Sequence, residues 1–311
     1  MGLTTVHKRN SSSDDGGRGI VAPPSPTVAR WDLSIRLRER RRDLGVDVKA
    51  ITDHLRFSRN YWSAVERDRT LLAKDKLEAL FDVLEFDDDE KVELRRLREA
   101  ARQRGWWMDY PALQDAIEDQ DLLRLVGLEA GAEHVQTYEG TVITGLLQTK
   151  EYARELITTD PAVSPIHVEQ LLEVRKRRQD RLWAQDPLKL STVMSQAALL
   201  QEIGGAAIQY RQLQHLVSAA KELGDSLELR IVPFNATPLG MIGSSTLYLL
   251  HFVGKRLPMV AFQEAAAPIG FVDDAERLRF LKLSYDRATK SALSHDDSIE
   301  LIQKIASESG N

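Results

Sequence analysis

Residues 46–69 read VDVKAITDHLRFSRNYWSAVERDR, a pattern typical of two short helices joined by a tight turn. Asp47 can cap the first helix, over 47–55, and Ser58 can cap the second, over 58–67. Apolar positions recur at helical spacing on one side of each helix, so the two helices can pack together. The inward-facing positions are Val48, Ile51, Leu55, Trp62 and Val65. The stretch therefore predicts a helix-turn-helix, in which the first helix holds the second against the major groove of DNA.

The second helix would present a polar surface to DNA. Arginine can donate two hydrogen bonds to guanine and asparagine can bond the adenine edge, each worth about 1–3 kcal/mol of discrimination. Residues 30–69 hold 11 Lys and Arg against 7 Asp and Glu, although the whole chain has a formal charge of −5. A local basic segment of this kind favours phosphate contact. The predicted DNA-binding residues are Arg59, Asn60, Tyr61, Ser63 and Arg67. The alternatives are a solvated helix face and, for Tyr61, local packing.

Helical patterns on both sides of this motif predict a compact five-helix module over 29–104. The inward positions of its first helix are Leu33, Leu37 and Leu44. The basic run 40–42 is expected to be a solvated face, with phosphate contact as the alternative. The acidic string 87–90 suits the positive end of the fifth helix.

The segments that flank this module differ from it in composition. Residues 1–28 are rich in Ser, Gly and Pro and predict a disordered tail. The weaker alternative is an arm that enters the minor groove through Lys8, Arg9 and Arg18. Residues 105–111 include two adjacent Trp and a Tyr, which are costly to leave in water, and they predict a packed junction.

The second half, over 112–308, mixes strand and helix patterns, and a length of 311 residues suggests about two domains. The predicted strands are 134–138, 188–194, 227–234, 245–253 and 257–263, and the last two can pair as an antiparallel hairpin. The predicted helices are 149–158, 167–185, 206–223, 274–289 and 296–308. The fold class is therefore multidomain, with an all-α helix-turn-helix domain followed by an α+β domain.

Signals for catalysis and metal binding are weak. Cysteine is absent, which excludes disulfides, thiolate metal sites and a cysteine nucleophile. The seven histidines show no ligand spacing, and no phosphate-binding loop or nucleophile elbow occurs, so we expect no catalytic residue, metal or cofactor and no enzymatic activity. Glu129, Glu139 and Glu264 could supply an acid–base pair, but their spacing does not indicate one. No apolar run approaches the ~20 residues that span a membrane, and the N-terminus lacks a signal-peptide core, so we expect a cytoplasmic protein without membrane contact.

Several stretches resemble a known family. Residues 36–39, 51–55 and 58–67 look like the Cro/phage-repressor (xenobiotic-response-element) helix-turn-helix family. With stretches from the second half, they resemble an actinobacterial, WhiJ-like architecture, often described as antitoxin-like, that joins this motif to a large C-terminal domain of unknown function. The stretches from the second half are 105–107, 127–130, 138–139, 145–149, 152–154, 212–213, 215–216, 232–234, 292–294 and 298.

This resemblance implies roles for individual residues. The implied base contacts are Arg59, Asn60 and Ser63, with Arg67 directed toward phosphate. Glu66 is expected to be structural, because the family's glutamate at this position pairs with an arginine of the first helix, here Arg36 or Arg38. It also implies a small partner protein encoded by a neighbouring gene.

Five positions depart from the family pattern. Arg56 stands at the turn position usually held by Gly, where a positive φ would cost about 1 kcal/mol. Thr52 replaces a small residue of the first helix of the motif, and Asp68 replaces the Gly that follows the second. In the C-terminal domain, Thr144 replaces a Pro and Gln196 an acidic residue.

Together these patterns predict a sequence-specific transcriptional regulator of a developmental, secondary-metabolism or toxin–antitoxin-like locus. We expect a double-stranded DNA operator and a homodimer, since one recognition helix contacts few bases. Residues 145–154 are expected to be structural, but an alternative is a pocket with Gln148, Tyr152 and Glu264 for an unknown small-molecule effector or partner. Two other functions stay open. One is an antitoxin-like protein-binding scaffold with a weakened DNA-binding module, and the other is an enzyme acting on a small molecule.

Overall fold

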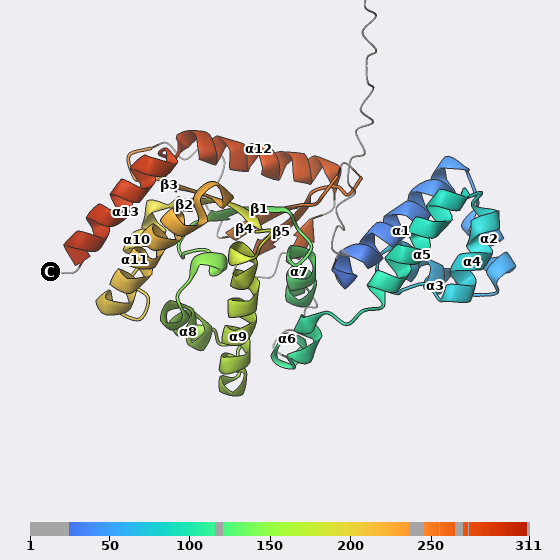
Figure 1. The fold of residues 1–311 in the computed structure, drawn as a ribbon, viewed down its shortest axis with the longest axis horizontal. Coiled ribbons are helices and arrows are strands. Elements are labelled where there is room, and N and C mark those ends of the chain that lie inside the picture. Colours follow the sequence, from blue (N-terminus) through green and yellow to red (C-terminus); the bar gives the residue numbers. More distant parts are fainter. Residues whose placement is uncertain are drawn as a thin grey trace, which may run out of the picture.

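The computed structural model describes residues 25–115, 121–236, 246–254, 256–264, 270–272 and 274–309. Figure 1 shows an all-helical N-terminal domain joined to a larger domain built on a mixed β-sheet. The predicted fold class, an all-α domain followed by an α+β domain, is confirmed.

The N-terminal domain consists of five helices that enclose one apolar core around the buried Trp62. They are α1 (Pro26–Asp43), α2 (Val48–Leu55), α3 (Arg59–Glu66), α4 (Lys74–Val83) and α5 (Asp88–Ala101). The predicted caps are confirmed: Asp47 accepts from Lys49 N at 2.6 Å, and Ser58 accepts from Tyr61 N at 3.1 Å. The helix-turn-helix of the sequence is therefore α2 and α3.

The start and the end of α1 correct two predictions. The helix begins at Pro26, because the Ser25 hydroxyl accepts from Val28 N at 3.2 Å, so the predicted tail extends too far. Residues 1–24, including Lys8, Arg9 and Arg18, lie outside the described residues. Leu44 is 39% exposed rather than inward-facing, because the helix has ended at Asp43.

Helix α1 belongs to two cores. One side of the helix places Ala29, Leu33 and Leu37 in the core of the N-terminal domain. The other side places Val28, Trp31 and Ile35 in the main core of the C-terminal domain. Each set repeats every three or four residues, so the two sets form separate stripes along the helix. The two domains are therefore joined by packing as well as by the chain.

The aromatic stretch 105–111 is packed, but its cluster is formed with helices of the C-terminal domain rather than between the two domains. Residues of η1 (Trp106–Asp109) and Tyr110 join an apolar cluster with α7 (Asp121–Glu129). Trp107 is buried over Gly105, where an added Cβ would lie 2.3 Å from the indole ring. The short α6 (Ala112–Asp115) lies between η1 and α7.

Six strands form one sheet in the order β3-β2-β1-β4-β5-β6. They are β1 (His134–Glu139), β2 (Lys189–Ser195), β3 (Leu227–Val232), β4 (Thr246–His251), β5 (Val260–Glu264) and β6 (Gly270–Val272). The first three are parallel, and β4, β5 and β6 continue the sheet in antiparallel pairs. The predicted hairpin of β4 and β5 is confirmed, whereas the three-residue β6 was not predicted, and the predicted strand position 245 lies outside the described residues.

Helices cover both faces of the sheet. They are α8 (Lys150–Thr159), α9 (Val168–Gln179), α10 (Gln196–Leu200), α11 (Ala206–Leu223), α12 (Ala275–Ser291) and α13 (His295–Ser309). In Figure 1, α12 lies on one side of the strands and α7, α8 and α9 lie on the other. Tyr285 and Leu281 of α12 join one core cluster, whereas Leu213, Leu216 and Ile302 of α11 and α13 join the larger one.

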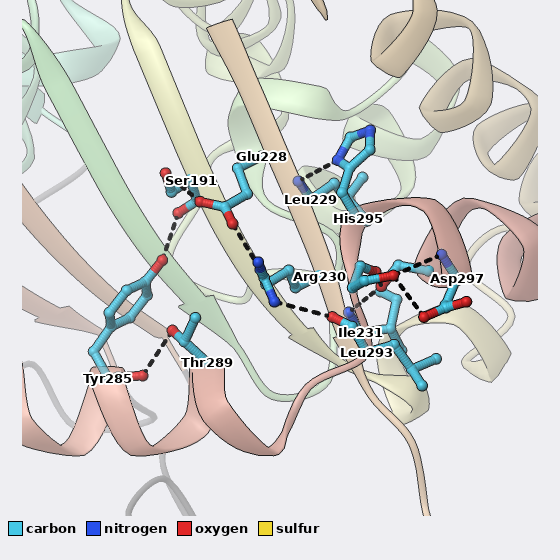
Figure 2. A network of polar contacts seen from close by, with 12 residues as sticks. Ser191, Glu228, Leu229, Arg230, Ile231, Tyr285, Thr289, Leu293, His295 and Asp297 are labelled. Carbon is cyan, nitrogen blue, oxygen red and sulfur yellow. Dashed lines mark hydrogen bonds and ion pairs between the residues drawn. The ribbon is translucent and has the colours of Figure 1, made fainter. Parts of the chain in front are cut away.

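The outer edge of β3 is covered by polar contacts from the C-terminal helices (Figure 2). The backbone N–H groups of Leu229 and Ile231 donate to His295 Nδ1 at 3.1 Å and to Ser298 Oγ at 2.9 Å. Leu293 N donates to the Ile231 carbonyl at 2.9 Å. Side chains and a loop therefore satisfy the groups to which another strand would bond. This assigns a structural role to two of the stretches that carry the family resemblance, 292–294 and 298.

Candidate functional site

The predicted DNA-binding residues on and after α3 differ in their exposure to solvent. Arg59, Asn60 and Arg67 are exposed, whereas Tyr61 and Ser63 are partly buried. The Tyr61 ring lies 5.1 Å from the ring of Phe57, centroid to centroid, so its face is packed locally. Arg59 and Asn60 occupy the first turn of the helix, the part of a recognition helix that contacts base edges.

The turn between α2 and α3 adopts a left-handed backbone conformation at Arg56, the positive φ considered from the sequence. Arg56 has φ 53° and ψ 51°, the left-handed region, and its side chain is exposed. Phe57 then packs its ring 6.0 Å from that of the buried Trp62. The packing of Phe57 in the core therefore stabilises the turn, although the left-handed conformation of Arg56 costs free energy.

The predicted ion pair of Glu66 exists, but with another arginine. Arg41 donates from Nε to Glu66 Oε1 at 2.6 Å and from Nη2 to Oε2 at 3.3 Å. The prediction of Arg36 is wrong, because its guanidinium bonds Asp32 one turn earlier. Arg38 lies one turn before Arg41 and donates only to the Glu66 carbonyl, at 3.4 Å. Glu66 is structural, as expected.

Two arginines of the basic run 40–42 are engaged within the protein. Arg41 holds Glu66, and Arg40 Nε donates to the Leu84 carbonyl at 2.9 Å. Arg42 is exposed. The expectation of one solvated face therefore holds for Arg42 alone.

Asp68 links α3 to the C-terminal domain. It is 6% exposed, with φ 59°, and its carboxylate lies 2.7 Å from Arg30 Nε and 3.9 Å from Arg124 Nη2 on α7. Burial raises the pKa of Asp68, and the two arginines oppose that shift. Asp68 therefore places a buried carboxylate between two guanidinium groups.

A cavity of about 750 Å³ lies beneath the sheet, against α7, α8 and α9. Its walls are formed largely by aliphatic side chains: Leu113, Leu122, Leu125, Val142, Ile143, Leu156, Ile157, Val163, Leu171 and Val174. Its polar end is formed by Glu139, Gly145, Gln148, Arg175, Arg178, Thr246, Tyr248 and Glu264. This volume and this mixture are typical of small-molecule sites.

Strand register aligns two carboxyl groups at the polar end. Glu139 on β1 pairs with Thr246 on β4, and Thr246 pairs with Glu264 on β5. Thr246 Oγ1 donates to Glu139 Oε2 at 2.8 Å. Burial, together with the charge of Glu264, raises the pKa of Glu139 to about 8. At neutral pH this carboxyl group therefore holds a proton.

Two arginines of α9 complete the polar end. Arg178 makes a bidentate pair with Glu129, with both N···O distances at 2.8 Å, and both side chains are buried. The charge of Glu129 raises the pKa of Arg178, although burial acts in the opposite direction. Arg175 donates to Gln148 Oε1, and burial beside Arg178 lowers its pKa to about 10.

The predicted pocket residues separate into two groups. Gln148 and Glu264 line the cavity, and they enter it from segments 116 positions apart in the chain. Tyr152 does not line it, because its ring is fully buried and its hydroxyl accepts from Ile143 N at 3.3 Å. Gln148 also donates to the Ile143 carbonyl at 2.6 Å. Gln148 therefore both stabilises the local backbone and lines the cavity.

Register also brings together two histidines that the sequence leaves separate. His134 on β1 pairs with His251 on β4, and their rings stack 5.3 Å apart. Burial lowers the pKa of both, to about 4 for His251, so both are neutral at neutral pH.

Within the described ranges, no group of three or more His, Asp or Glu could hold a metal ion. The same ranges contain no helix of the length and apolarity that crossing a membrane requires.

The sequence comparisons agree with the division of the chain into an N-terminal and a C-terminal domain. Residues 32–94 match a family profile described as a helix-turn-helix domain, which supports a DNA-binding regulator. Residues 122–304 match the profile of a domain of unknown function, DUF5753. That second match covers more than half of the chain, and the protein belongs to this family. No curated protein and no solved structure matches the chain.

Proposed function

We propose that this protein is a sequence-specific transcriptional regulator in which α3 contacts bases and the C-terminal domain binds an effector or a partner. The observation that supports it best is the first turn of α3, where Arg59 and Asn60 are exposed on a helix held by the buried Trp62 and Val65. Side chains at this position can reach base edges once the helix enters the major groove.

Charge supports the same surface. The exposed basic side chains around α2 and α3 that make no ion pair in the described chain are Arg42, Lys49, Arg56, Arg59, Arg67 and Arg69. Four half-buried arginines of α1, Arg30, Arg36, Arg40 and Arg41, are paired with Asp68, Asp32, Glu90 and Glu66. The unpaired basic groups thus remain available to phosphates.

The finer parts of this proposal rest on geometry and on the family resemblance. We propose a homodimer, since two recognition helices on half-sites about 34–36 Å apart would contact enough bases for tight binding. A cytoplasmic location follows from a DNA target. A small partner protein from a neighbouring gene, and a developmental, secondary-metabolism or toxin–antitoxin-like locus, are proposed from the resemblance alone.

An antitoxin-like scaffold without DNA binding is the second candidate. The departures at Arg56 and Asp68 were its support, but the fold accommodates both without distorting α3. We favour binding over catalysis in the C-terminal domain, because two of its buried charged residues, Glu129 and Arg178, neutralise each other.

The test is a selection of random double-stranded DNA on the purified protein at about 100–150 mM salt, where phosphate contacts alone are weakened. We expect an enriched palindrome that is lost in the double variant Arg59→Ala/Asn60→Ala. Arg102→Ala, at the C-cap of α5, is the matched control, because it removes an exposed arginine outside α3. Lack of enrichment with the wild-type protein, combined with stoichiometric capture of the neighbouring gene product, would favour the scaffold instead.

A further inference from the structure

Helix α12 has two different sides. Its inner side packs on the sheet, where Leu281, Tyr285 and Ala288 belong to an apolar core cluster. Its outer side exposes Phe280 by 66% and Leu283 by 52%. No other helix in the described part of the chain exposes two large apolar side chains. In Figure 1 this helix is the outermost layer on its side of the sheet, so a partner could reach the whole length of its outer side.

The exposed apolar pair belongs to a longer line of side chains, which we call the outer stripe. Its members are Glu276, Phe280, Leu283 and Arg287, and all four are exposed. They follow one another at intervals of four, three and four residues. This spacing aligns side chains along one side of a helix, as in the contact between the helices of a coiled coil. The outer stripe therefore has an apolar centre between an acidic end and a basic end.

Both charged ends of the outer stripe are available to a partner. Neither the Glu276 carboxylate nor the Arg287 guanidinium makes an ion pair or a hydrogen bond within the described residues. Beside the stripe, Lys282 and Asp286 pair with each other at 2.5 Å. A single exposed apolar residue is ordinary, but two of them between unpaired charges of opposite sign indicate a specific contact. This order of groups is complementary to itself when the second helix runs in the opposite direction.

We propose that two copies of this chain pair through α12, with the two helices antiparallel about a twofold axis that crosses each helix between residues 281 and 282. Phe280 would then pack against Leu283 of the partner subunit, and Glu276 would lie beside Arg287 of the partner subunit. Each contact occurs twice, as twofold symmetry requires. A parallel pair would instead bring identical charges together, which repel each other.

The charges beside the outer stripe agree with the antiparallel arrangement. Helix α12 carries five basic and two acidic side chains, so two copies would repel unless the acidic groups were well placed. In this arrangement Arg279 lies beside Asp286 of the partner subunit, where the flanking charges of paired helices interact. The remaining exposed basic groups, Arg277 and Lys290, lie on opposite flanks of the stripe. Each acidic group is therefore next to a basic group of the partner.

This inference rests on the proposed function, because it names the interface of the proposed homodimer. The helix has 17 residues and is therefore about 25 Å long. A contact limited to one such helix from each copy is smaller than the standard interface of about 800 Å² per partner. We therefore expect a dissociation constant in the micromolar range.

Sedimentation velocity of the full chain without DNA tests the inference, at concentrations from about 1 to about 200 µM, which include a micromolar equilibrium. We expect the wild-type protein to dimerise over this range. Phe280→Ala/Leu283→Ala should raise the dissociation constant at least tenfold, because this double variant removes the apolar centre. Val92→Ala on α5 is the matched control, because it shortens an apolar side chain that is 63% exposed outside α12.

Two results of this measurement would overturn the inference. One is a double variant that dimerises as tightly as the wild-type protein, in which case the homodimer stands but its interface lies elsewhere. The other is a wild-type chain that stays monomeric at about 200 µM. Binding of that monomer to vesicles of phosphatidylglycerol would then assign the outer side of α12 to an anionic lipid surface.

An exchange of charges tests the antiparallel direction. Glu276→Arg alone sets two arginines side by side, and Arg287→Glu alone sets two glutamates side by side, so each variant should dimerise at least tenfold more weakly than the wild-type protein. A mixture of the two variants restores both opposite-charge pairs and should form a heterodimer, a recovery that a misfolded variant could not produce. Lack of recovery would contradict the antiparallel pairing. DNA recognition by α3 is tested separately by the selection of random DNA, so the two proposals can fail independently.

Discussion

Arg56 and Asp68 are non-glycine residues that adopt the left-handed backbone conformation. Both stand where the family resemblance predicts glycine, and both take a positive φ, 53° and 59°. The family resemblance predicts the strain at Arg56, because it places this arginine at a turn position usually held by glycine. It does not predict why Asp68 is accepted, because its partner Arg124 lies 56 positions away and reaches it only through the packing of α7. Long-range ion pairs of this kind leave no local signal.

Replacing Arg56 by glycine should stabilise the protein. The Arg56 side chain is exposed, so Arg56→Gly chiefly removes the left-handed strain, and we expect the free energy of unfolding to rise by about 1 kcal/mol. Urea denaturation measures this change. Arg42→Gly in the last turn of α1 is the control, and it should lower stability by a similar amount because its backbone is helical. A loss of stability in Arg56→Gly would show that the arginine side chain itself is needed.

Glu139 should make the stability of the fold depend on pH. Its pKa is about 8 in the folded chain and about 4.5 when unfolded, so the folded state binds more protons between these values. Wild-type stability should therefore fall relative to Glu139→Gln as the pH rises from 5 to 8, by up to about 1.4 kcal/mol per pH unit. Urea titrations of both proteins at three pH values measure the difference. A difference that is constant over this range would contradict the burial of an ionisable Glu139.

At the scale of elements, the sequence predicted what is local and missed what depends on register. Caps at Asp47 and Ser58 and apolar periodicity were sufficient for α2 and α3, and the β4–β5 hairpin followed from two adjacent strand patterns. The cavity was only partly predicted, because the sequence identified Gln148 and Glu264 as lining residues. The alignment of Glu139 with Glu264 across neighbouring strands was missed, because it depends on the pairing of β1 with β4, which lie more than 100 positions apart. Strand β6 was missed because three residues hold too little pattern.

The contact of α1 with α7 should not tolerate a side chain at Gly127. An added Cβ there would lie 2.1 Å from Thr27 Oγ1, so α1 would have to move away. We expect Gly127→Ala to destabilise the protein by about 1–3 kcal/mol, as overpacking does in cores. Thermal or urea unfolding measures the loss. Gly145→Ala is the matched control, because its Cβ would have no neighbour nearer than 3.9 Å, and its effect should be much smaller.

At the scale of the molecule, the shared helix α1 should make the two domains unfold together. Trp31 packs its ring 5.1 Å from that of Phe252 and belongs to the C-terminal core, whereas Leu33 belongs to the N-terminal core. We expect one calorimetric transition for the wild-type chain. Trp31→Ala removes about 3–5 kcal/mol of packing at the contact between domains, and it should divide that transition into two.

The control for this prediction lies on the opposite side of the same helix. Leu33→Ala weakens the N-terminal core and leaves the contact with Phe252, so it should lower the transition temperature without dividing the transition. Two transitions in the wild-type protein would mean that the packing of α1 on the C-terminal domain is too weak to couple the domains.

The double membership of α1 also restricts how such a chain could evolve. Recombination within 105–111 could exchange the DNA-binding domain for a foreign one. The first helix of the foreign domain would then lack a side that is complementary to α7. The first helix of the acquired domain would need apolar residues equivalent to Val28, Trp31 and Ile35. It would also need a residue no larger than Thr27 at the contact with Gly127. New operator specificity would therefore arise more readily by substitution on α3 than by acquisition of a foreign domain.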